Sequence, residues 1–188
     1  MEKREFNATQ STSKNSLSLL CEVKNSGEEE NIFFINGYLQ RITNDERLYY
    51  NACPGDRCGR KVIEDSTGFH CENCQKTYPT CNPTYMMNAR LSDFTDSLFV
   101  NFARENGTAL IGMSAPELKK MRETKSEEEQ TEFFDTLNFK EVNVMVKGKP
   151  DFYNGEQRMK YYAIKVLPPS VGQQNKALLS RLETYASQ

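Results

Sequence analysis

Four of the six cysteines in the sequence have the spacing of metal-binding thiolates. Cys53 and Cys58 form one pair, Cys71 and Cys74 form a second, and twelve residues separate the pairs. Each pair can form a short turn that presents two sulfur atoms, and four such atoms make the closed tetrahedral site that suits Zn²⁺. A site filled by four thiolates has no open position for a reactive water molecule, so its role is structural. We therefore predict one structural zinc ion in a zinc ribbon that covers residues 53–81.

Other residues near the cysteine pairs are weaker alternatives as ligands. His70 is the one histidine, but it adjoins Cys71, and neighbouring residues of a strand point in opposite directions. Cys81 lies seven residues after Cys74 and could replace one ligand. A redox role for Cys71 and Cys74 is less favoured, because the pair lacks the strand-to-helix context of redox motifs. Cys21 lies in an alternating apolar segment and is interpreted as a small buried side chain.

The charge of the chain is nearly balanced but unevenly distributed. The formal net charge is −2 and the isoelectric point is about 5.6, whereas nucleic-acid-binding domains are usually basic. Acidic residues cluster at 28–30 and 123–132, while basic residues predominate from 147 to 165. A basic groove on an acidic body is therefore compatible with the total charge.

Composition and motifs disfavour three classes of protein: membrane-spanning proteins, secreted proteins and enzymes. No run of about 18 apolar residues is present, so we expect no membrane-spanning helix, and the polar N-terminal residues lack the apolar segment of a secretory signal. A single histidine, with no glycine-rich phosphate loop and no H-E-x-x-H motif, offers no set of catalytic residues. We therefore expect a protein that is not an enzyme.

The apolar pattern predicts a small barrel with helices. Residues 107–134 are predicted to be helical, with capping boxes at Ser114–Glu117 and Ser126–Glu129. Residues 147–155 contain two glycines and a proline, which is typical of a hairpin loop. Alternating apolar residues predict strands at 17–23, 32–42, 85–91, 97–103, 139–147 and 157–167.

This order of elements favours a mainly β fold with helices, specifically an OB-fold, which is a five-stranded barrel. The OB-fold domain is predicted to cover residues 16–170, with the zinc ribbon inserted in it at 53–81. Residues 1–15 are rich in Ser, Asn, Thr and Lys and are predicted to be disordered. Residues 171–188 are predicted to form a C-terminal interaction helix.

Several motifs resemble the C-terminal domain of the large subunit of replication protein A, and they occur in the same order. The resemblance runs from about residue 16 to the C-terminus. It implies an OB-fold with an inserted zinc ribbon, single-stranded DNA binding in DNA replication or repair, and a nuclear location. The family includes a telomeric paralog in a ciliate telomerase holoenzyme, so telomeric repeat DNA is a further expected ligand. The motifs are Tyr50-Asn51-Ala52-Cys53-Pro54, Lys61-Val62-Ile63, the four cysteines, Leu91-Ser92-Asp93-Phe94, Ala109-Leu110-Ile111-Gly112 and Tyr153-Asn154-Gly155.

The resemblance also implies where a single strand would bind. Phe99 corresponds to an aromatic residue that stacks on DNA, and Tyr153, with Phe152 beside it, corresponds to the aromatic residue of the hairpin. Phe94 is expected in the core, as is one of Phe99 and Phe102. Sequence-tolerant binding needs aromatic faces for the bases and cations along the phosphates. The basic residues predicted to contact phosphates are Arg90, Lys147, Lys149, Arg158 and Lys160.

The last helix carries an apolar stripe. In the family, this helix joins a three-helix bundle with two smaller subunits, so we expect it to bind other subunits of a replication protein A-like or telomerase complex. Two alternatives remain open: the stripe could cap the barrel, or the protein could be mainly an assembly scaffold with weak DNA affinity. The residues of the stripe are Leu178, Leu179, Leu182 and Tyr185.

Overall fold

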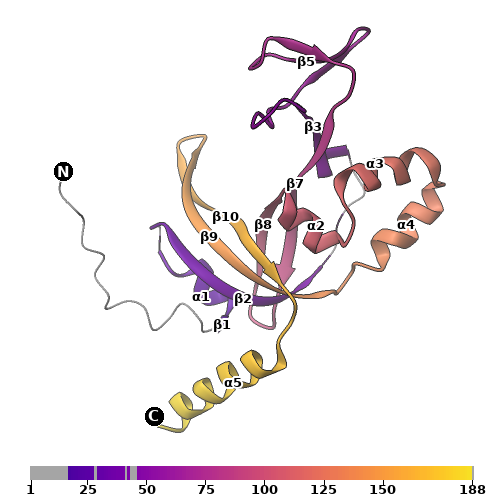
Figure 1. Cartoon of the computed structure of the whole chain (residues 1–188). Helices are drawn as coiled ribbons and strands as arrows, with labels where there is room; N and C mark the ends of the chain where they lie inside the picture. The colour runs from indigo at the N-terminus through magenta and orange to yellow at the C-terminus, as the bar shows by residue number, and fades with distance from the viewer. Residues whose placement is uncertain (1–16, 28, 41, 43–45, 188) are drawn as a thin grey trace.

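The computed structural model describes residues 17–187 except 28, 41 and 43–45 (Figure 1). The segment 1–15, predicted to be disordered, lies outside the described residues. In the described part, a β-barrel carries a separate three-stranded ribbon at one end and helices around its periphery (Figure 1).

Five strands close into the barrel. β2 pairs with β9, β9 with β10, β10 with β8, β8 with β7, and β7 returns to β2. All of these pairs are antiparallel except β8 with β10, which is parallel. This closed five-stranded arrangement is the predicted OB-fold. The strands are β2 (Asn31–Leu39), β7 (Asn82–Ser92), β8 (Ser97–Ala103), β9 (Glu141–Tyr153) and β10 (Glu156–Leu167).

Alternate residues of the strands fill the barrel. In β8, Leu98, Val100 and Phe102 are buried, whereas Phe99 is 63% exposed. Successive side chains of a strand point to opposite faces, so Phe102 is the core residue and Phe99 faces outward. The buried polar residue Asn143 is satisfied, because its side chain accepts a hydrogen bond from Asn36 and donates one to a carbonyl.

The helical region predicted for residues 107–134 consists of three helices. α2 (Glu105–Ile111) ends at Gly112, whose φ of 82° is accessible to glycine without strain. Both predicted capping boxes are confirmed, and they begin α3 (Ala115–Thr124) and α4 (Glu127–Asp135). The three helices lie together beside one end of the barrel (Figure 1), and their apolar residues join its core.

The strand predicted over residues 17–23 is wrong for most of its length. Only Leu17–Ser18 form a strand, β1, which pairs with β2. Residues Leu20–Lys24 form a short helix, α1. The backbone N–H of Leu20 donates to a carboxylate oxygen of Asp93 at 2.8 Å. This contact with a residue far along the chain stabilises the first turn of α1, and no local pattern could reveal it.

The hairpin loop predicted over residues 147–155 is also wrong in its extent. β9 continues to Tyr153, and the turn consists of Asn154 and Gly155, which both have positive φ, as a tight hairpin turn requires. Pro150 does not interrupt the strand, because β9 pairs with β2 only as far as Gly148 and is an edge strand beyond it. A proline is tolerated where no neighbour needs its N–H.

The ribbon projects from the end of two paired strands. β3 (Tyr49–Ala52), which follows a short 3-10 helix, η2 (Glu46–Leu48), pairs with β7, and Ala52 lies opposite Asn82. Beyond this point, three short strands form a sheet of their own, at the top of Figure 1. They are β4 (Ile63–Asp65), β5 (Gly68–Cys71) and β6 (Lys76–Tyr78).

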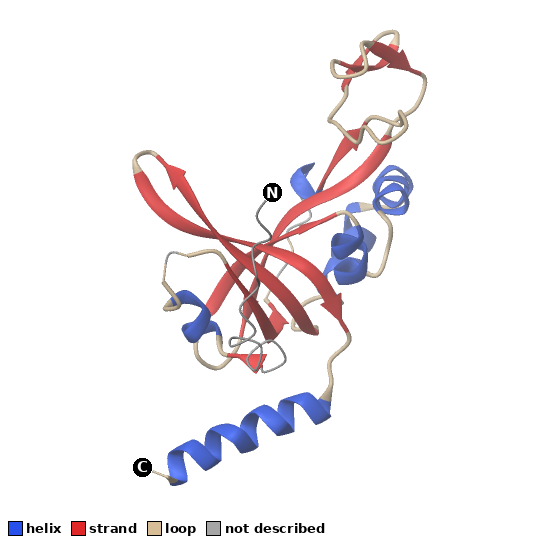
Figure 2. Cartoon of the chain, turned by 60° about the vertical axis from the view of Figure 1, so that its left-hand side comes forward, coloured by secondary structure: helices blue, strands red, loops and turns tan. Residues whose placement is uncertain are grey.

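The C-terminal helix α5 (Val171–Ala186) lies at the opposite end of the molecule from the ribbon (Figure 2). Ala177 packs against Leu17 and Phe34, and Arg181 donates a hydrogen bond to the carbonyl of Leu17 at 2.8 Å. None of the helices described here is both long and apolar enough to cross a membrane.

Candidate metal centre and nucleic-acid interface

The four predicted metal ligands come together in the ribbon. The sulfur atoms of Cys53, Cys58, Cys71 and Cys74 all lie within 4.8 Å of one another. The sulfur atoms of Cys53 and Cys74 are 3.8 Å apart, and those of Cys58 and Cys71 are 3.7 Å apart. A tetrahedral site with Zn–S distances of about 2.3 Å places its sulfur atoms about 3.8 Å apart. The four cysteines could therefore hold a metal ion with this geometry.

Short turns and nearby donors set the positions of the sulfur atoms. The backbone N–H of Gly55 donates to Cys53 Sγ at 3.3 Å, and the side chain of Asn73 donates to Cys58 Sγ at 3.5 Å. Such donors stabilise the thiolate form that binds a metal ion. The alternative ligand His70 lies outside the cluster, with its Nδ1 3.1 Å from Thr77 Oγ1. The four-cysteine set is therefore favoured over the alternatives that the sequence offered.

The sulfur atoms differ in their electrostatic surroundings. Burial raises the pKa of the Cys53 thiol to about 11. A hydrogen bond from the backbone of Arg60 lowers the pKa of the Cys58 thiol to about 7. A metal ion that binds here must displace protons from thiols of unequal acidity.

A groove runs across the outer face of the barrel between β8 and β10. Its first part is a hollow of about 490 Å³ that contains Phe99, Arg158 and Lys160, three of the predicted DNA-binding residues. A second hollow of about 380 Å³ shares Phe99 and continues to Arg90, a fourth member of that set, and to Lys24. The groove therefore brings together an exposed aromatic ring and cations from three separate parts of the sequence.

The pairing of β9 with β10 places further cations on the same face as Arg158 and Lys160. Lys149 lies directly opposite Lys160, and Asp151 lies opposite Arg158. Lys147 lies opposite Tyr162, which in turn pairs with Asn101 of β8. Directly opposed residues of an antiparallel pair share a face, so the four predicted cations of the hairpin form one surface. We call this surface the cationic face: Lys147, Lys149, Arg158 and Lys160.

The predicted aromatic residues lie in different places. The Phe99 ring is held beside Arg90, whose guanidinium carbon is 5.6 Å from the ring centroid. Phe152 is 73% exposed, but it lies on the opposite face of β9 from Asp151, because side chains alternate. The side chain of Tyr153 lies outside what the structure describes. Phe94, expected in the core, is 81% exposed in the turn between β7 and β8, so that expectation is wrong.

Sequence reasoning missed several residues that line the groove. Tyr162 is 38% exposed and follows Lys160 by two residues, so it shares its face. The same alternation along β10 could have identified it. The same rule places Asn101 on the face of Phe99 and Asn88 on the face of Arg90, but only the pairing of β7, β8 and β10 shows that these faces meet. Met159 also lines both hollows.

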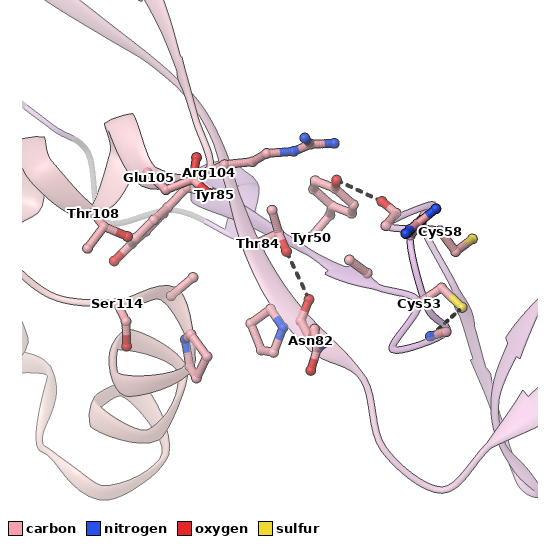
Figure 3. A pocket seen from close by; sticks show the side chains of 17 residues that line it. Tyr50, Cys53, Cys58, Asn82, Thr84, Tyr85, Arg104, Glu105, Thr108 and Ser114 are labelled. Carbon is pink, nitrogen blue, oxygen red and sulfur yellow. Dashed lines mark hydrogen bonds between the residues drawn. The ribbon is translucent and has the colours of Figure 1, made fainter. Parts of the chain in front are cut away.

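A third hollow, of about 480 Å³, separates the base of the ribbon from α2 and α3 (Figure 3). On the ribbon side, the Tyr50 hydroxyl donates to the carbonyl of Gly59 at 3.0 Å. On the helix side, the hollow is lined by Arg104, Glu105 and Thr108. Outside this hollow, α3 contacts the ribbon through Lys119, whose Nζ lies 5.9 Å from the centre of the Phe69 ring. The ribbon is therefore joined to the barrel mainly through β3 and β7.

The four residues of the α5 stripe are at least half exposed. Leu178 is 50% exposed, Leu179 60%, Leu182 63% and Tyr185 73%. The helix rests on the barrel through Ala177 and Arg181 instead, and Leu178 borders a hollow of about 220 Å³ between α5 and the barrel. The stripe is therefore mostly available for contact with another chain.

Comparisons with known proteins agree on one family. The family model of the replication factor-A C-terminal domain matches residues 32–178. The chain is 29% identical over 174 residues to the replication protein A 70 kDa DNA-binding subunit of Xenopus laevis, and 32% identical over 143 residues to a 70 kDa DNA-binding subunit of the same kind from rice, Oryza sativa. These matches cover 90% and 72% of this chain, but only 28% and 21% of those proteins.

Solved structures show the same relationship. A replication protein A heterotrimer bound to single-stranded DNA contains a chain that superposes with a TM-score of 0.80 at 27% identity. The match covers 90% of this chain and 40% of that one. Yeast replication protein A bound to single-stranded DNA superposes with a TM-score of 0.71 at 20% identity, over 82% of this chain and 86% of that one, and supports the fold. The chain therefore belongs to the replication factor-A C-terminal domain family.

Proposed function

We propose that this domain binds single-stranded DNA along the outer face of its barrel, as part of a larger protein that acts in DNA replication or repair. The observation that carries the proposal is the groove in which exposed Phe99 lies beside Arg158 and Lys160. Aromatic faces for bases and cations for phosphates are the two requirements for sequence-tolerant binding of single strands. Family membership and the solved heterotrimer bound to single-stranded DNA support the same role.

The aromatic and basic residues of this surface would contact different parts of the strand. Phe99 offers a face to one base, and Tyr162 offers part of its ring to a neighbouring base. The cationic face follows the β9–β10 hairpin, where it would contact successive phosphates. Phe152 and Tyr153 are near the tip of the hairpin, and a strand that leaves the groove would contact Phe152 only by passing round the tip to the other face of β9.

We propose that the metal ion of the ribbon is Zn²⁺ and that it is structural. The ribbon has a very small core, with Cys53, Val62 and Cys71 as its buried residues. When bound, the ion cross-links the turn at 53–58 to the turn at 71–74, which stabilises a segment that its own packing supports weakly. The four thiolates would hold the ion, and the proposed DNA-binding residues lie elsewhere, on the barrel.

We also propose that α5 binds other subunits of a replication protein A-like complex in the nucleus. The exposed stripe of Leu178, Leu179, Leu182 and Tyr185 supports this role, because an apolar face of this kind is typical of helices that pack against partner helices. The similar chain of known structure belongs to a heterotrimer. The DNA-binding and subunit-binding proposals use different residues and can both hold.

The experiment that tests DNA binding is a salt titration. The zinc-loaded chain is titrated with a fluorescently labelled single strand at a series of salt concentrations, and binding is followed by fluorescence anisotropy. We expect log K to fall linearly with log salt, with a slope between about −1.4 and about −2.8 for two to four neutralised phosphates. Duplex DNA of the same sequence is the control, because its stacked bases cannot reach Phe99.

A second comparison separates the possible roles. A telomeric-repeat strand and a scrambled strand of equal composition are titrated side by side. Equal binding supports a general role in replication or repair, while a clear preference for the repeat supports a telomeric role in a telomerase complex. If neither strand binds, the DNA proposal fails, and α5 becomes the basis of an assembly function.

A further inference from the structure

Two carboxylates lie within the cationic face and contact all four of its cations. Asp151 lies 3.2 Å from Arg158 Nε and 2.9 Å from Lys160 Nζ. Glu30 lies 2.5 Å from Lys147 Nζ and 3.7 Å from Lys149 Nζ. The predicted phosphate contacts of the hairpin are therefore occupied by the protein's own acidic side chains.

The two carboxylates reach the cations from different elements. Asp151 is a β9 residue directly opposite Arg158, so the pairing of the hairpin fixes its position. Glu30 immediately precedes β2, and it follows an acidic segment that begins after Gly27. Asp151 therefore covers the part of the face nearer the hairpin tip, and Glu30 covers the part that adjoins β2.

A purely structural role is one explanation of these ion pairs. Lys149 and Lys160 lie directly opposite each other, and like charges in opposed positions destabilise a sheet. Nearby carboxylates relieve this repulsion. However, the paired side chains are between 30% and 51% exposed, and exposed ion pairs contribute little to stability because water screens them. The same exposure leaves the pairs open to displacement by another anion.

The charges favour competition with phosphate. Both carboxylates are ionised near neutral pH, since hydrogen bonds from Lys160 and Arg158 lower the pKa of Asp151 and a hydrogen bond from Lys147 lowers the pKa of Glu30. Four cations and two carboxylates leave a net charge of +2 on this face, in place of +4. A phosphate that binds a cation here must first replace a carboxylate partner.

We propose that Asp151 and Glu30 are internal competitors that lower the affinity of the cationic face for single-stranded DNA and weaken its salt dependence. The inference rests on the proposed function, since it assumes that this face binds phosphates. In the free protein, the carboxylates take the places of phosphate groups. A bound strand displaces them, and they bind the cations again as soon as the strand leaves. The cationic face therefore releases DNA more readily than its four cations alone would allow.

The test uses neutral variants of similar shape in the full chain. Asp151→Asn and Glu30→Gln each remove one negative charge from the face, and Glu132→Gln on α4 makes the same change in total charge away from the groove. We expect Asp151→Asn and Glu30→Gln each to bind a single strand about three- to tenfold more tightly than wild type at low salt, consistent with the loss of two exposed ion pairs. Each should also steepen the salt slope by about 0.7, for one more effective cation. Glu132→Gln should stay within about twofold of wild type, because Glu132 lies on α4, outside the hairpin that carries the cationic face.

The outcomes distinguish the two proposals. If wild type binds DNA but Asp151→Asn and Glu30→Gln bind no more tightly than Glu132→Gln, the competition is refuted and the carboxylates are structural. Weaker binding by Asp151→Asn would also refute it, because the carboxylate would then be holding the cations in place for DNA. If neither wild type nor any variant binds, the proposed function itself fails. Thermal unfolding of each variant shows that affinity is compared between folded proteins.

Discussion

The most direct test of the groove is removal of its exposed ring by Phe99→Ala. The ring is 63% exposed, so the free protein loses little packing. Burying a whole phenylalanine stabilises a protein by about 1.5–3 kcal/mol, and the buried third of Phe99 therefore accounts for about 0.5–1 kcal/mol. Stacking of one base on an aromatic ring contributes about 1–3 kcal/mol, which corresponds to an affinity loss of about 5- to 150-fold. The variant should thus lose more binding free energy than folding free energy.

Two measurements on the same protein decide this prediction. Fluorescence anisotropy gives the affinity for a labelled single strand, and urea denaturation gives the free energy of unfolding. Phe99→Tyr keeps a ring and should retain most of the affinity. Phe139→Ala removes a ring that is 74% exposed and does not line the groove, so it should bind as wild type does. A folded Phe99→Ala variant with wild-type affinity would refute the placement of the DNA site.

Three further predictions concern the framework around the groove. In Gly107→Ala, the new Cβ would lie 2.4 Å from Tyr85 Cβ. Alanine gains about 1 kcal/mol of helix propensity, but the clash should outweigh this gain, and we expect a net loss of about 2 kcal/mol in the free energy of unfolding. Gly172→Ala is the control, because no atom lies within 4 Å of the new Cβ, and its free energy of unfolding in urea should be unchanged or slightly raised. Equal free energies of unfolding for the two variants would contradict the clash at Gly107. Asp93→Asn should cost about 1–2 kcal/mol at neutral pH, because Asp93 accepts hydrogen bonds from Thr95 and from backbone N–H groups. Burial raises the pKa of the Asp93 carboxyl, but these hydrogen bonds lower it by more, so the folded pKa lies below the unfolded value of about 3.9. The stability that the ionised carboxyl supplies is therefore present above about pH 3.9 and is lost as the pH falls through the folded pKa. Acid unfolding curves of wild type and variant should therefore converge at low pH, and a constant gap would contradict this. Removal of the metal ion by a chelator should raise hydrogen exchange in the ribbon and leave the barrel protected, whereas cooperative loss of protection in both would show that they unfold together.

The four-cysteine cluster could be predicted from the sequence because its information is local. The spacing of Cys53, Cys58, Cys71 and Cys74 predicts two short turns, and four thiolates in two such turns can form one tetrahedral site. The barrel was predictable from the alternation of its strands, which have a period of two over enough residues to be distinctive. The family resemblance directed attention to Phe99, and strand alternation explains why it faces outward while Phe102 does not.

The parts that could not be predicted depend on distant contacts. The short helix α1 is supported by Asp93, which lies in a turn of another part of the chain. The ion pairs of Glu30 with Lys147 and Lys149 depend on the register between β2 and β9. A sequence shows that acidic and basic residues are present, but only the paired strands show which of them share a face.

The ribbon leaves and re-enters the barrel at one point, since Ala52 and Asn82 face each other across β3 and β7. The 29 residues between them, 53–81, are in effect an enlarged hairpin loop whose ends are already held together by the barrel. The entropy of closing such a loop grows only with the logarithm of its length. The barrel therefore tolerates wide variation in the size of this insertion, and evolution can lengthen, replace or delete it with little effect on the strands that carry it.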